Sequence, residues 1–156
     1  MIRILIYTLF VCALLVRADP IELSHLLIEG NVSHSANGTY PFRVEVRQVT
    51  VDRVAHKQKY YYGHYDDKRQ YVCSSVAISL NGKSIEVPET AYSDLCYLQS
   101  IAPLELMEDG RWMVGIQGGS GGESYEVQLI FNAAKLLERR VAFEVPDKKT
   151  VDVRKF

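Results

Sequence analysis

Apolar and polar residues alternate along most of the chain, which is the pattern of half-buried β-strands. Phe42, Val44 and Val46 alternate with charged residues, and the apolar pattern resumes one residue out of step at Val49 and Val51. That one-residue shift predicts a β-bulge. The alternation recurs, and predicts further strands, around residues 76–80, 85–87, 104–106, 112–116, 125–131, 137–145 and 151–153.

Turn residues separate these segments. Asn81-Gly82 lies between two alternating runs and predicts a tight hairpin, because a type I′ turn needs positive φ at both central residues. Asp109-Gly110 and Asn132 mark further turns, whereas residues 89–100 break the pattern and predict a helical turn or an irregular crossing. Seven or eight strands with little helix predict a mainly-β fold: an antiparallel sandwich or a curled, barrel-like sheet.

The first 18 residues have the three parts of a cleavable signal peptide. Arg3 precedes the apolar run Ile4–Val16, and Val16-Arg17-Ala18 places small residues before a cut at Asp19. The run of 13 residues is too short to span a bilayer comfortably, since a helix needs about 20. We therefore expect a secreted or periplasmic protein with no membrane span after signal removal.

The predicted mature chain divides into two parts. Residues 19–40 form an N-terminal segment, with a strand near Leu26 and a loop over residues 29–38, and residues 41–156 form the β domain. Without Arg3 and Arg17, 16 basic residues remain against 19 acidic ones, so the mature net charge is −3. This balance, without a basic stripe, argues against nucleic acid as a partner.

Two cysteines, Cys73 and Cys96, remain after signal removal. In an oxidising compartment an even number of cysteines favours a disulfide, which would close a loop of 23 residues and stabilise by about 3 kcal/mol. The alternative is two buried thiols that behave as small apolar side chains.

The segment 56–67 has the most unusual composition in the chain, with four tyrosines, two histidines and two aspartates. Aromatic rings stack on sugars and are enriched at protein interfaces. The predicted binding surface, for an unknown protein or a carbohydrate, consists of Tyr60, Tyr61, Tyr62, His64 and Tyr65. The alternative is a polar hairpin whose tyrosines pack along the sheet.

Residues for catalysis or metal binding are sparse. His56, His64 and Asp66 are the candidate metal ligands, but their spacing matches no recognised zinc or calcium pattern. No nucleophile elbow occurs, and the glycine-rich corner at residues 118–122 is followed by a strand pattern rather than the helix of a phosphate site. We therefore predict no catalytic residues and no cofactor.

One charged residue falls on a predicted inward face. If Leu137 and Val141 point into the core, Arg139 does too. A buried guanidinium then requires a carboxylate partner or a pocket opening. The other interpretation is that this strand lies at a sheet edge.

Several short motifs carry a resemblance: Asn81 to Pro88, Ala91 to Leu95, Ile116 to Gly119 and Leu137 to Val141. Over residues 75–141 the chain resembles small exported bacterial proteins of unassigned function. The resemblance implies a bacterial periplasmic or secreted setting and transfers no site residues. The expected function is a non-enzymatic binding module; a small periplasmic hydrolase or metal-dependent enzyme and a structural envelope component are the alternatives.

Overall fold

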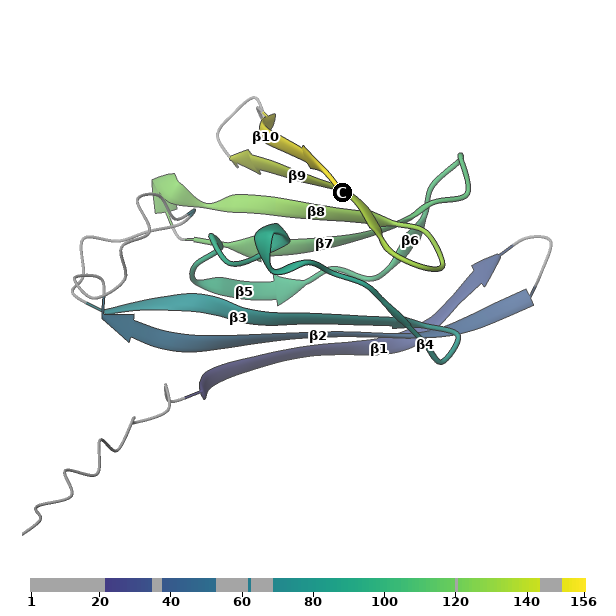
Figure 1. Ribbon diagram of the computed structural model, residues 1–156, viewed down its shortest axis with the longest axis horizontal. Coiled ribbons are helices and arrows are strands. Elements are labelled where there is room, and N and C mark those ends of the chain that lie inside the picture. The colour runs from purple at the N-terminus through teal and green to yellow at the C-terminus, as the bar shows by residue number, and fades with distance from the viewer. Residues whose placement is uncertain (1–21, 35–37, 53–61, 63–68, 120, 144–149) are drawn as a thin grey trace, which may run out of the picture.

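The computed structural model describes residues 22–34, 38–52, 62, 69–119, 121–143 and 150–156. In this part of the chain two antiparallel sheets lie face to face (Figure 1). The first sheet has the order β1-β2-β3-β4, with β1 Glu22–His34, β2 Gly38–Asp52, β3 Arg69–Leu80 and β4 Lys83–Ile85. The second has the order β10-β9-β8-β7-β5, and β6 also pairs with β7; its strands are β5 Leu98–Ile101, β6 Glu105–Leu106, β7 Trp112–Gly118, β8 Tyr125–Phe131, β9 Leu136–Phe143 and β10 Thr150–Lys155. The predicted sandwich is confirmed, and the sheets do not close into a barrel.

Helical structure is limited to single turns in the described residues. The 3₁₀ turn η1 (Glu89–Ala91) lies in the stretch where the alternation breaks, and η2 (Gly121–Glu123) lies in the glycine-rich corner between β7 and β8. Within the residues described, no helix has the length and apolar character needed to cross a bilayer.

The alternation in β2 separates core from solvent. Phe42, Val44 and Val46 are buried, while Arg43 and Arg47 are exposed and flank Glu45 on the outer face. Arg43 Nη2 donates to Glu45 Oε2 at 2.8 Å and Arg47 Nε donates to Glu45 Oε1 at 2.7 Å. These hydrogen bonds lower the pKa of the Glu45 carboxyl to about 2. The outer face of β2 around Glu45 is therefore charged, and the apolar face of this strand is part of the core.

The predicted hairpin and bulge are both present. Asn81 and Gly82 have φ values of 51° and 73°, as a type I′ turn requires, and they join β3 to β4. The register of β2 against β3 shifts between Arg47 and Gln48. After this shift Gln48 is the buried residue, with 2% of its surface exposed, whereas Val49 is only half-buried.

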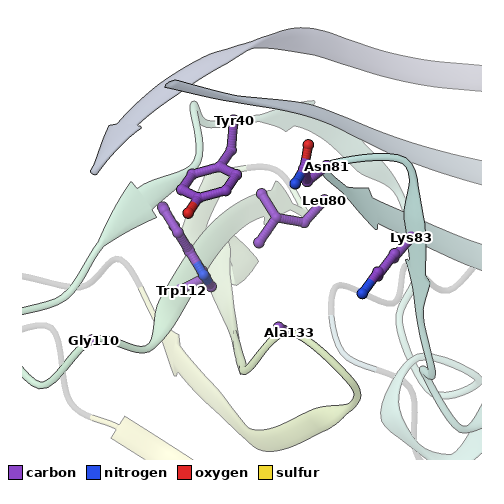
Figure 2. A pocket seen from close by; sticks show the side chains of 7 residues that line it. All are labelled: Tyr40, Leu80, Asn81, Lys83, Gly110, Trp112 and Ala133. Atoms are coloured by element: carbon purple, nitrogen blue, oxygen red, sulfur yellow. The ribbon is translucent and has the colours of Figure 1, made fainter. Parts of the chain in front are cut away.

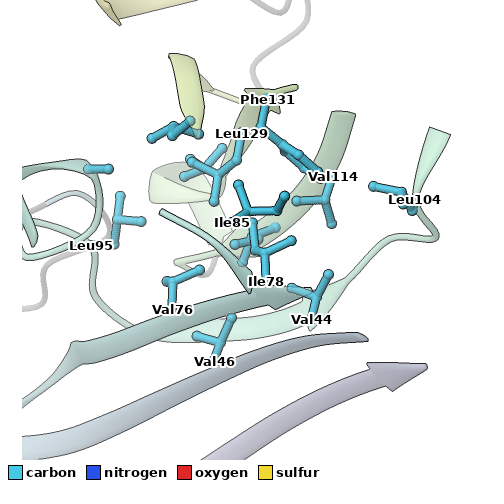
Figure 3. Close-up of a cluster of buried hydrophobic side chains, with 14 of the residues drawn as sticks. Val44, Val46, Val76, Ile78, Ile85, Leu95, Leu104, Val114, Leu129 and Phe131 are labelled. Carbon is cyan, nitrogen blue, oxygen red and sulfur yellow. The ribbon is translucent and has the colours of Figure 1, made fainter. Parts of the chain in front are cut away.

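The core lies between the two inner faces (Figure 3). Val44, Val46 and Ile78 of the first sheet pack with residues of the second sheet, including Val114 and Leu129, which are fully buried. Their burial removes apolar surface from water, at about 25 cal/mol per Å², and is the main stabilising term of a sandwich. The residues predicted to point inward from β3, β7, β8 and the part of β2 before the bulge form this core, whereas Val49 and Val51 after the bulge are only half-buried and Val153 is 50% exposed.

Two segments differ from the sequence prediction. The predicted loop over residues 29–38 is wrong for residues 29–34, because β1 continues to His34 and pairs with β2 along its length, with Val32 opposite Tyr40. The strand β5 begins within residues 89–100, the stretch that the sequence pattern predicts to be a helical turn or an irregular crossing. The last edge strand, predicted at Val151 and Val153, is present as β10. The predicted signal peptide lies outside the described residues.

Two backbone connections join the sheets. At one end, Glu86 N donates to Ala134 O at 3.1 Å and Leu136 N donates to Glu86 O at 2.8 Å, which ties the chain after β4 to the β8–β9 turn. At the other, Cys73 N of β3 donates to Leu95 O at 2.8 Å. Each connection holds a stretch of chain outside the strands in place, and a hollow in the surface lies beside each of them.

Candidate functional site

A cleft of about 230 Å³ opens where four chain segments meet at the β3–β4 end of the sandwich (Figure 2). Each segment contributes from the end of a strand or from a turn, so the sheets position the lining while the turns leave it accessible. The cleft is lined by Tyr40 of β2, Leu80 of β3, Asn81 and Lys83 of the β3–β4 hairpin, Gly110 before β7, Trp112 of β7 and Ala133 of the β8–β9 turn.

The base of this cleft is apolar and aromatic. Trp112 and Leu80 are 5% and 6% exposed, and the Tyr40 ring meets the Trp112 ring edge-on, with centroids 6.3 Å apart and planes at 76°. Asn81, Lys83 and Ala133 are exposed at the rim. The arrangement suits an apolar group that enters the cleft while its polar end stays near the rim.

The turns around the cleft are held by local hydrogen bonds. Asn132 Oδ1 accepts from the backbone N–H groups of Ala134 and Lys135, each at 2.9 Å, which orders the turn that carries Ala133. Gly110 has a φ of 81° and its N–H donates to Met107 O at 3.0 Å. The cleft is therefore largely preformed, which reduces the entropy lost when a ligand binds.

The predicted inward charge at Arg139 is confirmed, and it has the carboxylate partners that burial demands. The side chain is fully buried; Arg139 Nη1 donates to Asp94 Oδ1 at 2.5 Å and Nη2 donates to Asp152 Oδ2 at 2.5 Å. Arg154 Nη2 also donates to Asp94 Oδ2, at 2.8 Å. Burial alone would lower the pKa of Arg139, but the hydrogen bonds and charges of Asp94 and Asp152 outweigh it, so the pKa is raised. This cluster joins β9, β10 and the chain around Asp94.

Of the predicted tyrosine surface, only Tyr62 falls in the described residues. Its backbone N–H donates to Asp94 O at 2.9 Å, and its ring lies 5.9 Å from Tyr125 and 5.6 Å from the Arg139 guanidinium. Burial raises the pKa of its hydroxyl. Tyr62 thus packs against the core. The other four, Tyr60, Tyr61, His64 and Tyr65, lie outside the described residues.

The candidate metal ligands His56, His64 and Asp66 also lie outside the described residues. Within the part of the chain that the structure describes, no three His, Cys, Asp or Glu side chains converge to hold a metal ion. The glycine-rich corner leads through η2 into β8, so it connects two strands of the second sheet.

The structure corrects the predicted disulfide: Cys73 and Cys96 are both buried free thiols. Val72 pairs with Cys96 across the two segments, which brings the cysteines into the same region. Cys73 is part of the apolar core, and its Sγ donates weakly to Ser75 O at 3.6 Å. They behave as small apolar side chains, the alternative considered from the sequence.

We expect these thiols to resist alkylation in the folded protein. Burial raises the pKa of Cys73 to about 12 and raises that of Cys96 as well, so almost no thiolate, the reactive form, exists at pH 8. Iodoacetamide should modify neither cysteine in native buffer and both in denaturant, as intact mass spectrometry would show. Two unmodified cysteines in denaturant without reductant would instead indicate a disulfide.

The same shifts give a pH dependence. The unfolded chain releases these thiol protons near pH 9, before the folded chain does. Their contribution to the free energy of unfolding is therefore complete below pH 9 and is lost as the pH rises toward 12.

The cleft has no signature in the sequence. Its residues come from four separated segments, and the local pattern of each predicts only a strand end or a turn. Asn81-Gly82 predicts a hairpin, but alternation alone does not place that hairpin beside Tyr40 and Trp112. Comparisons with protein-family models, with curated proteins and with solved structures gave no match.

Proposed function

We propose that the protein is an exported, non-catalytic binding module that holds an apolar group of a protein partner in the cleft of Tyr40 and Trp112. The observation that carries the proposal is the buried aromatic base of the cleft, which opens to solvent between ordered turns. Binding clefts of proteins combine an apolar lining with a few placed polar groups. The polar groups here are Asn81 and Lys83.

The size and charge of the cleft define its ligand. An apolar cavity of about 150 Å³ admits benzene, so about 230 Å³ accommodates one leucine or phenylalanine side chain. Among the described residues that line the cleft, the cationic side chain is that of Lys83. The partner we propose is a peptide segment in which an apolar side chain is followed by a carboxylate.

The test uses a displayed library of random peptides, screened against the folded protein. We expect selected peptides to share an aromatic or leucine residue beside an acidic residue or a free C-terminus. Trp112 is the only tryptophan in the chain, so its fluorescence emission reports directly on the cleft. Binding of a selected peptide should change that emission.

Two variants make the test specific. Ala133→Arg fills the mouth of the cleft from an exposed position, and Lys83→Glu reverses the charge at its rim. Each should weaken peptide binding about tenfold, equivalent to about 1.4 kcal/mol, with the unfolding midpoint unchanged. Lys135→Glu, an exposed charge reversal outside the lining, is the matched control. Equal affinity for all three variants would reject the cleft as the binding site.

A further inference from the structure

A second hollow, of about 220 Å³, lies away from the Tyr40–Trp112 cleft. Tyr40 and Gln48 line different hollows from the same strand, β2, and eight residues of strand separate them by about 26 Å. We call this second hollow the Tyr71–Tyr97 notch. It is lined by Ser24, Gln48, Tyr71, Tyr97, Leu98 and Gln99.

Tyr97 has an unusual backbone conformation. Its φ is 54°, in the left-handed region where the Cβ of an L residue crowds the following carbonyl oxygen. Asn81 is the other non-glycine residue with positive φ in the described chain, and its turn explains it. A large aromatic residue in this region is rare, and such residues cluster at functional sites.

Hydrogen bonds on both sides hold Tyr97 in this conformation. Its N–H donates to Tyr71 O at 2.9 Å, and its carbonyl accepts from Gly119 N at 3.0 Å. The following residue, Leu98, pairs with the buried amide of Gln48: Leu98 N donates to Gln48 Oε1 at 2.7 Å, and Gln48 Nε2 donates to Leu98 O at 2.8 Å. The fold thus maintains the unfavourable φ and, with it, the position of the Tyr97 ring.

Two tyrosine rings in edge-on contact line the notch. Their centroids are 5.3 Å apart with planes at 66°, and Tyr71 is 40% exposed. An exposed aromatic face beside a second ring stabilises a flat, partly apolar ligand that stacks on it.

The remaining lining groups are polar and uncharged. Gln48 Nε2 donates to Ser24 Oγ at 2.6 Å, so Ser24 Oγ is the acceptor in this bond and its hydroxyl group can still donate a hydrogen bond to a ligand. The Gln99 amide nitrogen donates to Gly119 O, which leaves its carbonyl oxygen as an acceptor at the surface. None of the described residues that line the notch is Asp, Glu, Lys or Arg, and their amide and hydroxyl groups suit the hydroxyl groups of a neutral ligand.

We infer that the Tyr71–Tyr97 notch binds a neutral carbohydrate. A sugar ring stacks on Tyr71 against the edge of Tyr97, and its hydroxyl groups exchange hydrogen bonds with Ser24 and Gln99. This inference is independent of the peptide cleft, because it depends on other residues at a separate position.

The test is affinity electrophoresis of the full chain in gels that contain one neutral, soluble polysaccharide each: β-glucan, xylan, galactomannan, dextran or glycol chitin. Retardation is followed by calorimetric titration with the matching hexasaccharide. We expect binding to at least one of them, with unchanged Trp112 emission, since Trp112 lies in the other cleft.

Tyr97→Gly separates a binding role from a structural one. Glycine adopts positive φ without the Cβ crowding, so the variant should fold with an unchanged or higher unfolding midpoint. Its sugar affinity, and that of Tyr71→Ala, should fall about tenfold or more. Tyr40→Ser, a matched tyrosine substitution in the other cleft, should retain full sugar binding.

Four results would overturn the inference. They are no retardation by any of the five polysaccharides, full sugar affinity in both Tyr97→Gly and Tyr71→Ala, a proline-rich peptide that binds the notch in place of every sugar, and a marked loss of stability in Tyr97→Gly, which would show that the ring serves packing.

Discussion

Arg139→Met should lower the free energy of unfolding by about 3 kcal/mol or more, because removal of one partner of a buried ion cluster leaves the others uncompensated. Methionine keeps most of the volume of the arginine stem but none of its five donors. Asp94 would then lose the bonds at 2.5 and 3.0 Å from the two guanidinium nitrogens, and Asp152 the bond at 2.5 Å. The backbone carbonyl of Ala91 would also lose its donor, at 3.2 Å.

The neighbouring residue supplies the control. Arg140 is on the same strand with its side chain 38% exposed, and its Nε pairs with Glu138 at 2.5 Å. A surface pair of this kind contributes about 0–1 kcal/mol, so Arg140→Met should be nearly neutral. Urea denaturation followed by far-UV circular dichroism measures both variants. Equal, small effects would show that the Arg139 cluster does not hold β9, β10 and the chain around Asp94 together.

Local rules predicted much of the fold. Period-two alternation identified β2, β3, β7 and β8, because each buries one face against the opposite sheet. Asn81-Gly82 identified its hairpin through the φ values that the turn demands. The same alternation predicts that Arg139 shares the inner face of its strand with Leu137 and Val141. A buried guanidinium needs a carboxylate partner, and Asp94 and Asp152 provide it.

Interactions between distant segments escaped the sequence pattern. Gln48 reads as a polar residue at a register shift, yet it is buried because its amide pairs with the backbone of Leu98, 50 residues away. The left-handed φ of Tyr97 likewise has no local signal, since the hydrogen bonds that Tyr97 donates to Tyr71 O and accepts from Gly119 N hold it. The cleft and the notch both depend on such long-range pairings, which is why neither could be predicted from the chain alone.

The chain from Asp94 to Gln99 links these features. The Asp94 carboxylate pairs with Arg139, and the Cys96 carbonyl accepts from the Tyr125 hydroxyl. The Leu98 N–H donates to the Gln48 amide. Three buried polar side chains therefore contact this one segment. The Tyr125 hydroxyl and the Gln48 amide satisfy the backbone N–H and C=O groups of Cys96 and Leu98. The segment is therefore tied to both sheets by side chains, although its sequence has no alternation.

A second large effect is expected at Gly118, which lies opposite Tyr125 in the β7–β8 pair. The Tyr125 ring lies directly over this glycine: a Cβ placed there would be 2.6 Å from both Cζ and Oη of the ring. The ring cannot move aside at low cost, because it is fully buried and its hydroxyl donates to Cys96 O at 2.7 Å and accepts from Cys96 N at 3.0 Å. Gly118→Ala should therefore destabilise by about 2–4 kcal/mol, through overpacking and through loss of these buried hydrogen bonds.

Gly122→Ala is the matched control, since a Cβ at Gly122 meets nothing within 4 Å. Chemical denaturation of both variants measures the difference, and a double-mutant cycle with Tyr125→Leu tests its cause. If the ring is responsible, Gly118→Ala should lower the free energy of unfolding much less in the Tyr125→Leu background. An equal loss in both backgrounds would contradict the explanation.

Because Cys96 directly precedes Tyr97, displacement of the Tyr125 ring should also disturb the Tyr71–Tyr97 notch. Gly118→Ala should then weaken sugar binding while the emission of Trp112, at the other cleft, stays unchanged.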